Sequence, residues 1–190
     1  GSLYTNTTGA SNTAVGDNSL FANTTGSNNT AVGKSALNAN TTGQYNIAVG
    51  HLALDANTTT SHNTAIGYNA LGAHTTNEQN VAVGNYTLAS DTEGEWNTAL
   101  GYGAMYGNTT GSNNTAVGRL SLYGNTTGGS NVALGVNALN ANTTAGDNTG
   151  LGYATLHANT TGTRNTAAGS QALLVHTTGD DNTAVGALAL

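Results

Sequence analysis

The feature that most constrains this chain is a repeat of 17 residues that runs from end to end without an insertion or deletion. One copy covers residues 23–39, and the next two copies begin at Asn40 and Asn57. A short, fixed period is typical of stacked repeat architectures, in which each unit buries its apolar face only against its neighbours. We call the residues at the same position in successive copies a column. We call one copy of the repeat, which forms one full turn of the stacked structure, a rung.

Two columns hold large apolar residues in nearly every copy, five residues apart. The valine column is Val15, Val32, Val49, Ile66, Val83, Leu100, Val117, Leu134, Leu151, Ala168 and Val185. The leucine column is Leu3, Leu20, Leu37, Leu54, Leu71, Leu88, Met105, Leu122, Leu139, Leu156, Leu173 and Leu190. This pattern predicts an all-β fold, a parallel β-solenoid of eleven 17-residue rungs that forms a single repeat domain over residues 1–190.

The residues around the valine column predict which way each strand faces. The threonine column lies two positions earlier: Thr13, Thr30, Ile47, Thr64, Val81, Thr98, Thr115, Val132, Thr149, Thr166 and Thr183. Strand alternation puts these two columns on one side, which we expect to be the interior or an interface, and puts the intervening alanine column of Ala14 and Ala31 outside. In a homotrimer we expect the alanine column or the leucine column to meet its copies near the threefold axis. We expect two strands of about five residues per rung, over residues 12–16 and around Leu20.

Glycine and asparagine columns predict the corners. The Gly16 column has no exception, which indicates a positive φ or a close backbone approach. A second glycine column, that of Gly9, predicts a turn and is interrupted by Thr60, Asn77 and Ala145. The column of Asn12 is unbroken, and the column of Asn6 gives way only to His74, Asp91 and His176. Stacked asparagines about 4.8 Å apart predict amide ladders along the solenoid.

The segment Asn12-Thr13-Ala14-Val15-Gly16 and its copies resemble the Asn-Ser-Val-Ala-Ile-Gly signature of the YadA-like head repeats of trimeric autotransporter adhesins. The whole pattern is also similar to repeat arrays in bacterial and phage tail-fibre proteins. The resemblance implies a left-handed solenoid, three chains wide, in an extracellular fibre on a cell surface or virion. The family unit is near fourteen residues, whereas this one is 17 with an added Asn-Thr-Thr-Gly corner.

Composition excludes several classes of function. The chain has three Lys plus Arg and a net charge of −6, so it lacks the basic surface that nucleic acid requires. It has no Cys for disulfides or thiolate metal sites, and no apolar run that approaches a membrane span. Because the chain opens and closes inside a repeat, we expect it to be a fragment of a longer fibre protein.

No arrangement of nucleophile and base is visible in the sequence, so we expect neither an enzyme nor a cofactor. The five His are expected to be isolated surface residues. A weak candidate for a cation site is the acidic group of Glu78, Asp91, Glu93 and Glu95, because carboxylates on adjacent rungs could bind Ca²⁺. A solvated corner where the repeat decays is the simpler interpretation of this group.

Exposed aromatic residues and a threonine array point to two different functions. Candidate binding residues are Tyr45, Trp96, Tyr106 and Tyr123, whose rings could stack on sugars or pack between chains. They favour an adhesive fibre segment, a homotrimer whose variable corners bind a surface glycan or protein. The alternative is an ice-binding solenoid, whose array would be Thr8, Thr25, Thr42, Thr59, Thr76, Thr110, Thr127, Thr144, Thr161 and Thr178. Glu93 interrupts that array in the middle of the stack.

Overall fold

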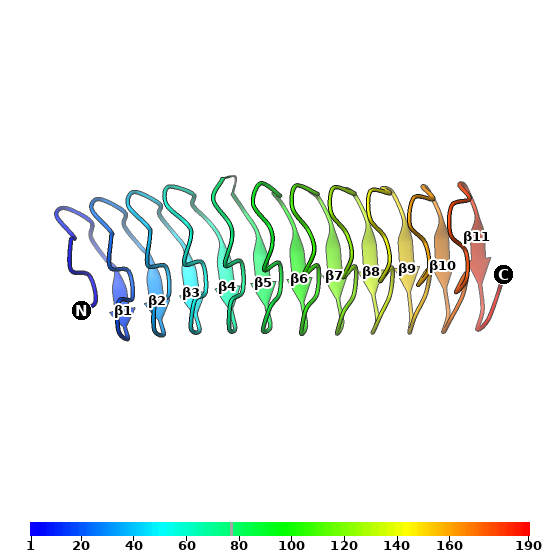
Figure 1. Ribbon diagram of the computed structural model, residues 1–190, viewed down its shortest axis with the longest axis horizontal. Coiled ribbons are helices and arrows are strands. Elements are labelled where there is room, and N and C mark those ends of the chain that lie inside the picture. The colour runs from blue at the N-terminus through cyan, green and yellow to red at the C-terminus, as the bar shows by residue number, and fades with distance from the viewer. Residues whose placement is uncertain (77) are drawn as a thin grey trace.

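In the computed structural model, which describes residues 1–76 and 78–190, the chain coils into a parallel β-solenoid with one short strand per rung (Figure 1). The strands are β1 (Thr13–Val15), β2 (Thr30–Val32), β3 (Ile47–Val49), β4 (Thr64–Ile66), β5 (Val81–Val83), β6 (Thr98–Leu100), β7 (Thr115–Val117), β8 (Val132–Leu134), β9 (Thr149–Leu151), β10 (Thr166–Ala168) and β11 (Thr183–Val185). They pair in chain order in a single sheet, and Thr13 lies opposite Thr30. The architecture predicted from the 17-residue period is confirmed. Within the described residues, no helix has the length and apolar character needed to cross a bilayer.

The sheet faces the opposite way from the predicted one. Ala31 and Ala48 of the alanine column are fully buried, whereas Val15, Ile66 and Leu100 of the valine column are 57%, 39% and 46% exposed. The reason is the narrow interior of each rung. A Cβ added to Gly150, which belongs to the alanine column, would already lie 2.9 Å from Oγ1 of Thr155 and 3.5 Å from Cγ of Leu139. The interior holds alanine methyl groups in the other rungs and has no room for a valine side chain, so the valine and threonine columns point outward.

The leucine column forms the opposite wall of the interior. Leu20, Leu37 and Leu54 are fully buried and belong to one continuous apolar core with the alanine column. Each rung therefore contributes a single large apolar side chain to the interior. This core is thinner than the sequence pattern indicated, because only one of the two large apolar columns is enclosed.

The predicted second strand around Leu20 does not form. Residues 17–22 make successive turns, with φ values of 54° at Asn18 and 50° at Leu20. This left-handed backbone is uncommon outside glycine and curls the chain too tightly for an extended strand. The rungs remain linked there, because the Leu20 amide donates to the Ala36 carbonyl at 2.9 Å.

The two glycine columns have different physical causes. Gly33 of the Gly16 column has a φ of 135°, and a Cβ there would lie 2.5 Å from the carbonyl oxygen of Gly50, so both predicted reasons hold. In the second column a Cβ at Gly26 would lie 2.4 Å from the Gly43 carbonyl oxygen, although Gly26 does not have a positive φ. Close stacking of rungs explains that corner. Asn77, which interrupts this column, lies outside the described residues.

Candidate functional site

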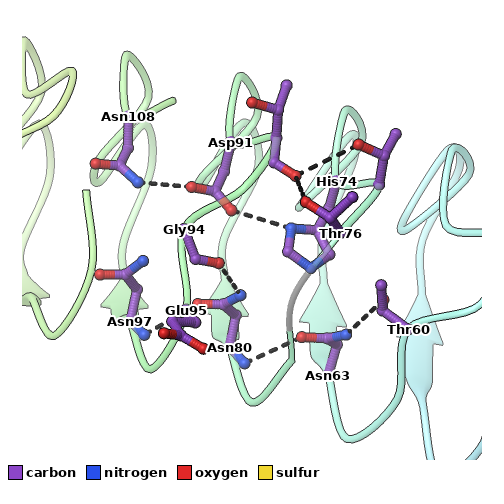
Figure 2. A network of polar contacts seen from close by, with 12 residues as sticks. Thr60, Asn63, His74, Thr76, Asn80, Asp91, Gly94, Glu95, Asn97 and Asn108 are labelled. Atoms are coloured by element: carbon purple, nitrogen blue, oxygen red, sulfur yellow. Dashed lines mark hydrogen bonds and ion pairs between the residues drawn. The ribbon is translucent and has the colours of Figure 1, made fainter. Parts of the chain in front are cut away.

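The predicted asparagine ladders are present on two sides of one corner. In the first ladder, the column of Asn6, the Asn40 amide donates to Asn23 Oδ1 at 2.8 Å and Asn23 donates in turn to Asn6 Oδ1 at 2.8 Å. In the second ladder, the column of Asn12, the backbone amide of Asn29 donates to Asn12 Oδ1 at 2.9 Å. The two ladders run side by side across the rungs (Figure 2).

A histidine and an aspartate replace two asparagines in the first ladder (Figure 2). His74 and Asp91 lie on adjacent rungs, both fully buried, with Nδ1 of His74 3.0 Å from Oδ2 of Asp91. Asn108 donates to the other carboxylate oxygen of Asp91 at 2.6 Å. In the rest of the ladder, the asparagine at the position of Asp91 donates to the preceding rung. A carboxylate has no proton to donate, so in this contact His74 supplies the donor and Asp91 accepts. The expectation that His74 is a surface residue is wrong.

Burial sets the protonation behaviour of Asp91. Desolvation raises the pKa of Asp91 above its ordinary value of 3.8, and the hydrogen bond from His74, the His74 charge and the Asn108 amide oppose this rise. The sequence contained a signal for this pair, because positions 74 and 91 differ by one repeat and depart together from asparagine. The pair was not predicted, because His74 was grouped with the other histidines and Asp91 with the other acidic residues rather than with each other.

The acidic group proposed as a cation site does not converge. Asp91 points into the interior, whereas Glu78 and Glu93 are exposed and Glu95 is half-buried. Nδ1 of the exposed His62 lies 3.6 Å from Oε2 of Glu78. Within residues 1–76 and 78–190, no group of three or more His, Cys, Asp or Glu side chains could hold a metal ion. The outward carboxylates fit the simpler interpretation of a solvated corner.

The four aromatic residues predicted to bind a ligand fall into two places. Tyr45 stacks on His62 with ring centroids 5.2 Å apart, and the Trp96 indole N–H donates to Gln79 Oε1 two rungs further along. These residues share the column that precedes each strand. Tyr106 and Tyr123 stack at 5.3 Å and 10° on the turn after the strand. The sequence identified both stacks, but they do not form one site.

Around Tyr106 and Tyr123 the structure assembles a larger group of rings. Tyr86 meets Tyr102 edge-on at 6.1 Å and Tyr106 at 6.4 Å. We call Tyr86, Tyr102, Tyr106 and Tyr123 the tyrosine cluster. The cluster borders an open surface hollow of 620 Å³, which is also lined by Gly103, Leu120 and Asn140. Sequence reasoning missed Tyr86, Tyr102 and Gly103, because they belong to columns that vary; the density of tyrosines within three rungs was the available signal.

The threonine array lies on the corner between the two ladders rather than on the sheet. Its ten members, from Thr8 to Thr178, are all exposed. The preceding threonine of each pair is engaged within the fold, as where the Thr24 hydroxyl donates to the Thr41 carbonyl at 3.0 Å. Within the array itself, the Thr76 hydroxyl also donates to the next rung, to the Thr92 carbonyl at 3.3 Å.

The outer face of the sheet carries the valine and threonine columns along the whole solenoid. No position in either column holds a charged residue. Leu100, Leu134 and Leu151 remain 46%, 38% and 38% exposed there. A long uncharged face with regularly spaced aliphatic side chains differs from an ordinary solvated surface.

Comparisons with protein-family models, with curated proteins and with solved structures found no significant match.

Proposed function

We propose that this chain is a non-enzymatic adhesive segment of an extracellular fibre, on a cell surface or a virion, and that it assembles as a homotrimer. The observation that carries the proposal is the outer face of the sheet. Its two columns, which include Ile66, Leu100 and Val117, run uncharged from β1 to β11. Exposed apolar patches of this extent mark interaction surfaces in soluble proteins.

The outer face also moves the expected place of chain–chain contact. The alanine and leucine columns cannot meet a partner, because Ala31 and Leu37 are fully buried inside their own rungs. Contact through the valine and threonine columns would bury the exposed aliphatic side chains and add a second apolar layer to a solenoid with a thin core. Identical faces with a constant repeat suit identical partners in register, which favours a closed symmetric assembly.

Adhesion is assigned to the variable corners. The columns that fold the rung are nearly constant, whereas the corner after each strand changes from Lys34 to His51, Tyr68 and Arg119. A stiff repeat can present many weak corner contacts together, and avidity then raises the total affinity without a single deep site. A surface glycan or a surface protein is the proposed ligand class.

Ice binding is the second candidate, and one observation favours it. Exposed threonines recur once per rung along the array from Thr8 to Thr178, at a spacing set by the rungs of about 4.8 Å. The array is interrupted at Glu93, which is exposed among the threonines. The threonines also lie on a corner rather than on the flat sheet.

One experiment separates the two functions. The purified chain is applied to a glycan array and to intact cells, and a thermal-hysteresis assay with ice-crystal imaging is run on the same preparation. The fibre proposal predicts saturable surface or glycan binding and unshaped ice crystals. Faceted crystals in the wild type that are lost in the variant Thr25→Lys/Thr42→Lys/Thr59→Lys would overturn the fibre proposal and establish the alternative.

A further inference from the structure

The hollow beside the tyrosine cluster is lined at one position by a residue that has no side chain. Gly103 belongs to the column of Asn18, Asn69 and Asn137, and between residues 18 and 188 it is the only glycine there. A Cβ at Gly103 would lie 3.0 Å from Cδ2 of Leu120 and 3.7 Å from Cε2 of Tyr123. A side chain at position 103 would therefore push against Leu120, which lines the hollow, and change its shape.

Backbone geometry does not require the glycine. Gly103 has a φ of 61°, and Asn69, Tyr86 and Asn137 adopt 53°, 58° and 58° in the same column. Non-glycine residues thus fold at this place in the neighbouring rungs. The turn therefore does not require the absence of a side chain at this one rung, where tyrosines gather.

The walls of the hollow are aromatic, uncharged and held in place. The Tyr106–Tyr123 pair is stacked at 10°, and Tyr86 packs edge-on against Tyr102 at 79°. Rings fixed by such contacts lose little freedom when a ligand binds. All seven lining residues are neutral in type, and the four phenols provide hydroxyl groups. Partial desolvation, with the neighbouring phenol of Tyr68 as the next cause, raises the pKa of Tyr86 above its ordinary value of 10.0.

From this geometry we infer that the hollow at Gly103 is a binding site for a short neutral oligosaccharide. A volume of 620 Å³ falls in the range of roughly 300–1,000 Å³ found for small-ligand sites. The hollow is open, with Tyr102 52% exposed, so much of a bound ligand stays in water and the ligand must itself be polar. Sugar rings combine hydroxyl edges with apolar C–H faces, which suits phenol rings that have an apolar body and a polar tip. The Asn140 amide donates to the Leu120 carbonyl at 3.0 Å, which leaves its Oδ1 to accept from a sugar hydroxyl.

The site rests on the proposed adhesive function, for which it names a ligand class, and it can be tested separately. Cellotriose, maltotriose and triacetylchitotriose serve as probes in saturation-transfer NMR titrations of the purified chain. At least one is expected to bind with a dissociation constant of about 1 mM or below. Gly103→Asn restores the residue that Asn69 and Asn137 provide, so the turn should fold. Its side chain should displace Leu120 from the lining of the hollow and weaken binding by about tenfold or more.

A matched pair of variants provides the control. Tyr102→Ala removes a ring that is 52% exposed inside the site, and Tyr153→Ala removes a ring of the same column that is 53% exposed outside it. Loss of about tenfold in affinity for Tyr102→Ala with no change for Tyr153→Ala would support the site. No binding of any of the three saccharides, or equal affinity in wild type and Gly103→Asn, would overturn it. If Gly103→Asn still adheres to cells or arrays as the wild type does, this site is wrong while the adhesive function stands.

Discussion

At the scale of single residues, the departures from the repeat carry more information than the repeat itself. Asparagine in the first ladder both donates and accepts, so each copy satisfies its neighbours. Asp91 can only accept, and its position between His74 and Asn108 works because both neighbours direct N–H groups at its oxygens. A buried carboxylate that depends on two specific partners is costly to form and sensitive to pH.

Asp91→Asn should stabilise the protein more as the pH rises. Burial raises the folded-state pKa of Asp91 above 3.8, so the folded state holds its proton at pH values where the unfolded state has lost it. The contribution of Asp91 to the free energy of unfolding is then complete below pH 3.8 and is lost as the pH rises through the folded-state pKa. Asparagine cannot ionise and has no such loss, so the variant should be more stable than the wild type at pH 7, and the difference should grow as the pH rises.

Urea denaturation of both proteins between pH 4 and 8 measures this difference. Asp147→Asn, at an exposed position, is the control and should leave the pH dependence unchanged. A difference between wild type and Asp91→Asn that stays constant across this range, or a variant less stable than wild type at pH 7, would contradict the account of this pair.

At the scale of elements, the ladders and the strands show what could be predicted. The parallel sheet, the Gly16 column and both ladders follow from recurrence, because a residue type that never varies down a stack must meet its own copy. The direction in which the strand faces did not follow. Thr13, Ala14 and Val15 alternate equally well either way, and the outcome depends on the width of the rung.

The width of the rung is set by the turns around Leu20, which the secondary-structure propensities of their residues do not predict. Leu20 and its copies adopt a left-handed backbone at a cost of roughly 1–2 kcal/mol per residue, which only tertiary packing can repay. For a related reason, only two of the four residues of the tyrosine cluster could be predicted from the sequence. Tyr106 and Tyr123 share a column and were found together, whereas Tyr86 and Tyr102 come from two other columns that meet only in the folded corner.

The first ladder contains one fault that can be repaired. Oδ1 of Asn159 is buried without a hydrogen-bond partner, because the next member of the column is His176, whose Nε2 contacts the Gly179 carbonyl at 2.9 Å instead. His176→Asn would restore the donor that Asn142 provides to Asn125 at 2.9 Å. Satisfying this acceptor should raise the free energy of unfolding by about 1 kcal/mol.

The repair is measured as an increase in the urea midpoint with an unchanged slope, at one fixed protein concentration. His51→Asn, on an exposed corner, is the matched control and should leave the midpoint in place. An equal or lower midpoint for His176→Asn would show that the ladder does not act as a continuous element.

At the scale of the whole molecule, the solenoid buries only one of its two large apolar columns. The leucine column lies inside the rungs, whereas the valine column lies on the outer face. The outer face is uncharged over eleven strands, while the corners on either side of it carry the variable residues. Assembly through that face would leave the corners free, so the same molecule could be stiffened by its partners and still present the tyrosine cluster. Assembly is therefore the claim on which the proposed fibre depends.

The mass of the particle in solution tests that claim most directly. Sedimentation equilibrium at micromolar concentration should give three times the chain mass of 18.8 kDa, about 56 kDa. Leu100→Lys/Leu134→Lys, which places two charges on the outer face, should reduce the mass to 18.8 kDa while the circular dichroism spectrum is retained, and Thr110→Lys on the exposed corner should leave the trimer intact. A wild-type chain that sediments as a stable monomer of 18.8 kDa would contradict the account.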